Sequence, residues 1–188
     1  MAELVNMAGD GMPFYLWSKS AQGDESPWAV GEARARRESG GFSYRNTVVR
    51  EHNGAVVAAL IGYPLPFEPE PVDYEELPPM FVPLQRLEDR VSGTWYVNVL
   101  ATYPDFRGRG AGAALLGIAD RLAAETKRKG LSLIVSDANP GAQRLYERHG
   151  FEELATEPMV KDAWETEGSQ WVLMKKPQVP TTFRRSRR

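Results

Sequence analysis

The chain has 188 residues, which is enough for one domain with a sizeable core and short for two. It contains no cysteine and only two histidines, so disulfides, thiolate nucleophiles, cysteine metal sites and three-histidine zinc sites are excluded, and no metal is expected. The 23 basic and 25 acidic residues give a net charge of −2, and four of the basic residues are arginines within the last five positions. The acidic body argues against nucleic acid as a ligand. Without a membrane-length apolar run or a signal peptide, we expect a cytoplasmic protein.

The first part of the chain predicts helices followed by a hairpin. The helical patterns cover 1–8, 12–20 and 28–38. The β-rich runs 47–52 and 55–62 flank Asn53-Gly54, a pair typical of a type I′ turn because both central residues need positive φ. We therefore expect an antiparallel hairpin after the helices.

Residues 64–92 differ in composition from both flanks. Seven of the 14 prolines lie within 64–83, and five carboxylates lie between Glu68 and Glu76 with no basic residue among them. Too little chain lies on either side for two cores, so this segment predicts an excursion from one domain, with a short helix over 84–91. The expected domain spans 1–177, and 178–188 is expected to be a disordered basic tail.

The rest of the chain alternates strands and helices. Asn139 followed by Pro140 is typical of a helix start, and three basic residues before Gly130 favour a helix end with a left-handed glycine cap. The order of elements predicts a mixed α/β domain. The expected strands are 94–103, 131–135, 151–156 and 170–175, and the expected helices are 108–129 and 139–150.

The segment from Pro104 to Ala113 joins a strand to the long helix. Free N–H groups and the dipole at a helix start favour an anion, and glycine lets the backbone approach a phosphate. The residues alone allow an ordinary glycine-rich helix entry or a dinucleotide site on Gly108-x-Gly110-x-x-Ala113. The dinucleotide pattern lacks context, because the glycines follow the strand by several residues and Asp137, the candidate ribose acid, lies too far along.

Two motifs together resemble those of the GNAT family of N-acetyltransferases. The first is Arg107-x-x-Gly110-x-Gly112 after a strand, and the second is Asn139 followed seven residues later by Tyr146 and then by Gly150-Phe151. The resemblance covers about residues 45–176. It implies a mixed, mostly antiparallel sheet flanked by helices. The family's first edge strand is missing because a helix is expected from residue 1, so we expect the natural chain to begin upstream.

The resemblance implies an acetyl-CoA-dependent acyltransferase that acetylates a primary amine of a small molecule or peptide by direct attack in a ternary complex. Such a reaction needs no protein nucleophile, so the lack of cysteine is no obstacle. The implied partners are acetyl-CoA and the amine, with no nucleic acid and no membrane, and a homodimer is left open. The alternatives are a non-catalytic acyl-CoA-binding or regulatory module and, less favoured, a dinucleotide-binding protein.

The resemblance also implies a role for each site residue. Tyr146 would protonate the leaving thiolate, and the N–H of Leu100 would stabilise the oxyanion. Asn139 and the backbone of Leu100, Ala101 and Thr102 would hold the pantetheine arm. The pyrophosphate would bind the backbone of the loop, which comprises Arg107, Gly108, Arg109, Gly110, Ala111, Gly112 and Ala113. The residues alone favour Tyr146 as a core aromatic, and they are compatible with Asn139 as an N-cap.

The sequence leaves the general base unassigned. Some family members carry a glutamate at the position that is Ile134 here, and its same-face neighbours Ser132 and Ser136 are weak bases. The preceding strand offers only Tyr96 and Asn98. A water, a carboxylate from another element, or an amine of low pKa are the remaining possibilities.

The acceptor is expected between the early helices, the Pro-rich excursion and the last hairpin. The acids of 68–76 either attract a cationic amine or form a solvated loop, and the second interpretation is favoured. His149 is expected to be structural and His52 to be exposed. The aromatic side chains of this region predict a pocket or ordinary core with equal support, and they are Tyr15, Trp17, Tyr63, Trp95, Trp164 and Trp171.

Overall fold

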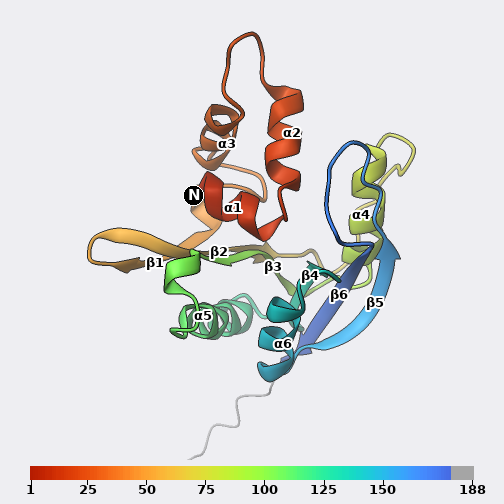
Figure 1. The fold of residues 1–188 in the computed structure, drawn as a ribbon. Helices are drawn as coiled ribbons and strands as arrows, with labels where there is room; N and C mark the ends of the chain where they lie inside the picture. The colour runs from red at the N-terminus through yellow and green to blue at the C-terminus, as the bar shows by residue number, and fades with distance from the viewer. Residues whose placement is uncertain (179–188) are drawn as a thin grey trace, which may run out of the picture.

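A six-stranded sheet with helices on both faces forms the centre of the computed structural model, which describes residues 1–178 (Figure 1). Its order is β1-β2-β3-β4-β6-β5, and only β3 and β4 run parallel. The expected mixed, mostly antiparallel sheet is confirmed. The strands are β1 (Thr47–His52), β2 (Ala55–Pro64), β3 (Trp95–Thr102), β4 (Gly130–Ser136), β5 (Glu152–Pro158) and β6 (Gln170–Pro177).

Helices cover the sheet unequally. Helices α1, α2 and α3 lie over one face, and α5 and α6 lie over the other (Figure 1). Helix α4 packs beside β5 and β6. The helices are α1 (Ala2–Ala8), α2 (Met12–Ser20), α3 (Pro27–Ala35), α4 (Val82–Asp89), α5 (Ala111–Glu125) and α6 (Pro140–Arg148), with 3-10 turns at Tyr44–Asn46, Pro79–Phe81 and Pro104–Phe106.

Alternation along the strands divides the core between the two faces. On β2, Ala58 and Leu60 face the α5–α6 side, whereas Ala59 and Ile61 face the α1–α3 side. A third cluster, which includes Leu87 of α4, lies beneath α4 and the β5–β6 connection. Because both faces are covered, the central strands are mostly apolar, with Asn98 of β3 and Ser132 and Ser136 of β4 as exceptions.

The hairpin and the helix starts agree with the sequence prediction. Asn53 and Gly54 have φ values of 51° and 77°, as a type I′ turn requires. Asn139 caps α6, because its Oδ1 accepts a hydrogen bond from the N–H of Ala142 at 3.0 Å. The first strand of the described chain is β1, which lies at the sheet edge and follows three helices.

The long helix is shorter than predicted. Gly108 and Gly110 have positive φ, so α5 starts at Ala111 rather than at residue 108. The expected cap at Gly130 is wrong, because Lys127 adopts the left-handed conformation (φ 55°) and ends the helical backbone earlier. Gly130 instead begins β4, where a Cβ atom would lie 2.1 Å from the Lys176 carbonyl oxygen. Its lack of a side chain therefore serves strand pairing.

The Pro-rich excursion forms no strand. Its five acids, from Glu68 to Glu76, are all exposed, which agrees with a solvated acidic loop. The expected basic tail lies, from residue 179 onward, outside the described residues. Within 1–178, none of the helices is both long and apolar enough to cross a membrane.

Candidate active site

The two parallel strands at the centre of the sheet separate part-way along. β3 pairs with β4 only as far as Val97 opposite Leu133. At the paired end, the buried hydroxyls of Thr94 and Ser132 lie 2.6 Å apart and hydrogen-bond to each other. Beyond Val97, β3 continues to Thr102 while paired only with β2. One edge of β3 is therefore left without a strand partner.

A β-bulge accompanies this separation. The register between β2 and β3 shifts from Ile61 opposite Val99 to Gly62 opposite Val97, so Asn98 is the extra residue. A Cβ atom on Gly62 would lie 2.2 Å from the Trp95 ring, so only glycine fits there. Asn98 is consequently exposed although it belongs to a central strand.

The backbone of β3 presents donors to the gap. The N–H of Tyr103 donates to the Val57 carbonyl of β2 at 3.0 Å. Because N–H groups alternate between the two sides of a strand, those of Leu100 and Thr102 point away from β2 toward β4. No strand accepts from them there, since the pairing with β4 has already ended.

The glycine-rich loop adds a second set of free donors. Within residues 1–178, no backbone or side-chain acceptor receives a hydrogen bond from the N–H groups of Gly108 through Ala113. Space is open where Cβ atoms of Gly108 and Gly110 would lie. Free donors at the start of a 15-residue helix fit a diphosphate, which is stabilised both by N–H groups and by the helix dipole.

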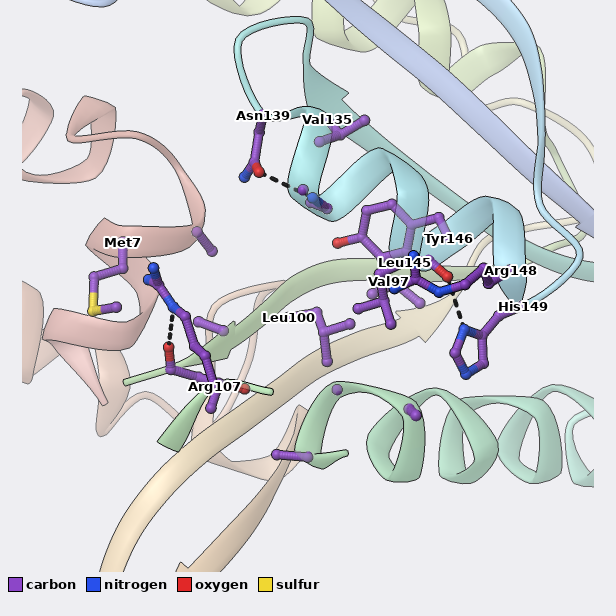
Figure 2. Close-up of a pocket in the computed structure, with 18 of the residues that line it drawn as sticks. Met7, Val97, Leu100, Arg107, Val135, Asn139, Leu145, Tyr146, Arg148 and His149 are labelled. Atoms are coloured by element: carbon purple, nitrogen blue, oxygen red, sulfur yellow. Dashed lines mark hydrogen bonds between the residues drawn. The ribbon is translucent and has the colours of Figure 1, made fainter. Parts of the chain in front are cut away.

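The two arginines of the loop are engaged with the protein itself. Arg107 donates from Nε to the Thr102 carbonyl oxygen at 3.0 Å (Figure 2). The guanidinium of Arg109 lies over the Phe106 ring, 5.4 Å from its centroid. These contacts brace the loop, whose backbone carries the free donors, and Arg107 also lines the cleft.

The gap and the loop belong to one cleft of about 590 Å³. It brings together every candidate site residue from Leu100 to Ala113 except Arg109, together with Asn139 and Tyr146. Sequence reasoning missed Met7 and Ala8 of α1, because only the tertiary fold brings that helix to the sheet. It also missed other lining residues, which are Val97, Phe106, Val135, Gly141, Ala142, Leu145 and Arg148.

Tyr146 is buried yet has a free hydroxyl. The residue is 7% exposed, and its ring lies 5.7 Å from that of Phe151. Within residues 1–178, no group hydrogen-bonds to its oxygen, which points into the cleft (Figure 2). Burial raises the pKa of Tyr146 to about 12, so the phenol stays protonated at neutral pH.

The two histidines behave as the sequence predicts. His149 Nδ1 donates to the Leu145 carbonyl oxygen at 2.7 Å, so the ring is held within its own helix, at one end of the cleft. His52 is exposed, and its ring lies 5.5 Å from that of Phe106.

The described residues match the family model described as the acetyltransferase (GNAT) family over residues 12–151. The chain belongs to the GNAT family of acetyltransferases. Membership makes the protein an acyltransferase enzyme with acetyl-CoA as its co-substrate. The dinucleotide interpretation fails, because such sites need successive parallel strands and this sheet has one parallel pair.

Solved structures share this GNAT fold. A protein described as an acetyltransferase is 22% identical with a TM-score of 0.61, and the match covers 95% of this chain and 93% of that chain. An N-acetyltransferase from Staphylococcus aureus Mu50 is 20% identical (TM-score 0.58, covering 93% and 92%). A GNAT family acetyltransferase from Elizabethkingia anophelis with acetyl-CoA bound is 17% identical (TM-score 0.52, covering 70% and 74%). A comparison with curated protein sequences finds no match.

The candidates for a general base are poorly suited to that task. Ser132 is buried against Thr94, and Ser136 Oγ accepts from the N–H of Ala138. Tyr96 is buried, and both burial and the nearby Glu88 carboxylate hold its pKa well above the usual range. Among the described residues that line the cleft, none is an aspartate or glutamate.

One unusual carboxylate lies outside the cleft. Glu88 of α4 is largely buried, and desolvation, with a smaller contribution from Asp89, raises its pKa to about 7. Its neighbours Arg86 and Arg90 lie 3.9 Å from Glu157 instead. The sequence around Glu88 does not predict this raised pKa, because the burial that causes it depends on how α4 packs in the folded protein.

The six aromatic residues expected near the acceptor do not form one pocket. Trp17 belongs to the cluster under α1–α3, and Trp95 belongs to the cluster under α5 and α6. Trp164 and Trp171 stack with ring centroids 5.9 Å apart in the third cluster, where Tyr15 and Tyr63 also lie. The core interpretation therefore holds for most of these side chains, Tyr15 and Tyr63 are partly buried, and Trp171 also borders a second cavity.

Proposed function

We propose that the enzyme transfers the acetyl group of acetyl-CoA to a primary amine of a small molecule or peptide, by direct attack within a ternary complex. The observation that carries the proposal is the cleft itself. It joins free N–H groups on β3, free N–H groups on the glycine-rich loop and the unpartnered Tyr146 hydroxyl, and no cysteine or serine is among the described residues that line it.

The proposal assigns the two ends of acetyl-CoA to two sets of donors. The pyrophosphate binds the backbone from Arg107 to Ala113, where the N–H groups of Gly108 through Ala113 are free and that of Arg107 donates to the Pro104 carbonyl oxygen. The pantetheine arm binds along Leu100, Ala101 and Thr102 on one side and Asn139 on the other, all of which line the cleft. The side chain of Asn139 caps α6 through Oδ1, so its Nδ2 group remains available as a donor.

The chemistry then requires two groups from the protein, a donor for the oxyanion and a proton donor for the sulfur. The amine nitrogen bonds to the acetyl carbon, the C–S bond breaks, sulfur gains a proton and nitrogen loses one to solvent water, since none of the described residues that line the cleft is an aspartate or glutamate. The N–H of Leu100 stabilises the charge that develops on the acetyl oxygen. Tyr146 donates its hydrogen bond, and then its proton, to the departing sulfur. Because its pKa of about 12 exceeds that of an ordinary thiol, full transfer of this proton to the thiolate is uphill. The hydrogen bond therefore supplies most of the stabilisation of the departing sulfur, and a phenolate formed by transfer regains its proton from solvent.

Release of CoA across a panel of primary amines tests the proposal. The panel includes alkylamines, amino acids, short peptides with free N-termini and the matching alcohols. We expect amine-dependent CoA release with at least one class and none with the alcohols. A thermal-shift comparison run alongside should show stabilisation by acetyl-CoA and none by NAD. Tight acetyl-CoA binding without CoA release from any amine would contradict the proposal.

A further inference from the structure

A second cavity adjoins the cleft. It has a volume of about 180 Å³, which is room for about six water molecules. It shares Met7, Ala8, Val135 and Asn139 with the cleft, so the two spaces are neighbours. Figure 2 shows Met7 and Asn139 at the end of the cleft away from His149. We call this cavity, between the α1–α2 turn, the end of β4 and the β5–β6 connection, the side chamber.

The side chamber carries two carboxylates from opposite ends of the chain. Asp10 comes from the α1–α2 turn and Glu167 from the β5–β6 connection, and no lysine or arginine lines the chamber. Neither acid has a cation within 4.0 Å among residues 1–178, whereas Asp162 nearby is paired with Lys19 at 2.5 Å. Both residues are exposed, so the open side of the chamber carries negative charge without a paired cation, which attracts a cation.

The walls of the chamber are held in place by the protein. The indole N–H of Trp164 donates to the Asp10 carbonyl oxygen at 3.0 Å, and the hydroxyl of Thr166 donates to the Asp10 carboxylate. On the next turn of the connection, Asp162 accepts from Tyr15 at 2.6 Å and from Lys19. The two segments that carry Asp10 and Glu167 are thus tied together, and the position of the Asp10 carboxylate is set before a ligand arrives, whereas the Glu167 side chain is exposed.

The remainder of the chamber is suited to methylene groups. Trp171 is buried and contributes an aromatic wall, and Val135 and Met7 contribute aliphatic carbon at the junction with the cleft. The Tyr146 hydroxyl, on a side chain that is 93% buried, points into the cleft with no protein partner. A ligand that extends from the chamber into the cleft therefore passes from negative charge, along apolar carbon, to the reaction centre.

We propose that the side chamber binds the acceptor, and that the acceptor is a short aliphatic amine with a second positive charge. The second ammonium group lies near Asp10 and Glu167, the methylenes lie along Trp171, and the reacting amino group enters the cleft. This assignment rests on the proposed function, and it adds the class of amine that the enzyme selects.

A matched pair of amines tests the charge requirement. 1,4-Diaminobutane and pentylamine have equal numbers of heavy atoms and differ in one terminal group, an ammonium against a methyl. We expect kcat/KM for the diamine to exceed that for pentylamine by about tenfold or more at low ionic strength. High salt should reduce this ratio, because it screens the attraction between the second ammonium and the carboxylates.

Two neutral replacements test the residues. Asp10→Asn keeps the acceptor for Thr166 and tolerates the positive φ of 52° at this position, and Glu167→Gln keeps the size of the side chain. Each should lower the diamine preference severalfold through KM, and each should leave the Kd for acetyl-CoA unchanged. Glu165→Gln is the matched control, because Glu165 is an exposed acid of the same connection that does not line the chamber.

The outcomes separate the inference from the function on which it rests. Equal kcat/KM for the two amines would overturn the inference while amine acetylation stands. A lower kcat with unchanged KM in Glu167→Gln would also overturn it, because loss of a catalytic base gives that result. If no amine releases CoA from the wild-type enzyme, the proposed function fails and this inference fails with it.

Discussion

At the scale of single residues, Tyr146 combines a packing role with a free hydroxyl. Its ring is buried against Phe151, so most of the side chain would be explained by the core alone. The hydroxyl is what packing does not explain, since a buried phenol usually finds a partner and this one faces the cleft instead. Removing the hydroxyl oxygen while keeping the ring tests the two roles of this side chain separately.

We predict that Tyr146→Phe lowers kcat about 100-fold and changes the Kd for acetyl-CoA by less than about twofold. The ring still packs in the variant, whereas the donor to sulfur is gone. CoA release measures the first effect and titration calorimetry the second. Tyr44→Phe is the control, because Tyr44 is 46% exposed and lies outside the cleft. Unchanged kcat with chemistry rate-limiting would refute the role of the hydroxyl.

Two glycines, one at the N-cap of α5 and one in the middle of this helix, should respond in opposite ways to a methyl group. Gly110 has a φ of 77°, so Gly110→Ala should cost about 1–2 kcal/mol of stability and weaken acetyl-CoA binding about tenfold. Gly117 is an exposed helical residue with open space around it, so Gly117→Ala should stabilise by about 0.5–1 kcal/mol and leave binding unchanged. Urea unfolding and calorimetry measure both variants. Wild-type stability and affinity in Gly110→Ala would show that the left-handed turn is dispensable.

At the scale of elements, α4 carries a carboxyl group that opposes folding at neutral pH. Glu88 has a pKa of about 7 in the folded protein against an ordinary value of 4.5. As pH rises from about 4.5 to about 7, the unfolded chain releases this proton before the folded chain does. The free energy of unfolding therefore falls over this interval, and the folded state is penalised above it.

We predict that Glu88→Gln raises the free energy of unfolding at pH 8 by on the order of 1–2 kcal/mol and has almost no effect at pH 4. Glutamine keeps the shape of the side chain and has no charge to desolvate. Urea unfolding of wild type and variant at pH 4, 6 and 8 measures the difference. Glu76→Gln, at an exposed position, should show no such pH dependence. An equal effect at pH 4 and pH 8 would contradict the burial of this charge.

The elements also show where sequence-based prediction succeeds and where it does not. The strands and helices were predicted in the right order, because turn and cap residues such as Asn53, Gly54 and Asn139 act on their immediate neighbours. The ends of α5 were misplaced at both sides. At the end of this helix, Lys127 takes the left-handed conformation that glycine was expected to adopt, because Gly130 is needed where β4 meets Lys176.

At the scale of the whole molecule, the three core clusters depend on one another. β2 contributes alternate residues to the clusters on both faces of the sheet, and β6 does the same with Val172 and Leu173. The N-terminal helices are also tied to the β5–β6 connection through Asp10 and Asp162. If the helices on one face of the sheet unfolded, they would therefore expose strands that also support the core on the other face.

We propose that residues 1–177 form one domain, and we predict a single cooperative unfolding transition. The calorimetric and van 't Hoff enthalpies should agree. Acetyl-CoA at about 100 times its Kd should stabilise the folded state by about 2.7 kcal/mol and raise the Tm by roughly 5–10 °C as one transition. Two resolved transitions, with only one shifted by acetyl-CoA, would contradict a single domain.

The sequence by itself determined the local parts of this protein: the turn between β1 and β2, the cap of α6, and the glycine-rich loop with its free donors. Each depends on backbone conformations within a few residues. Only the tertiary structure decided where β3 leaves β4, that Met7 and Ala8 line the cleft, and that Asp10 and Glu167 meet in the side chamber. It also decided the charge state of Glu88. These features depend on contacts between residues far apart in the chain, and no local pattern encodes such contacts.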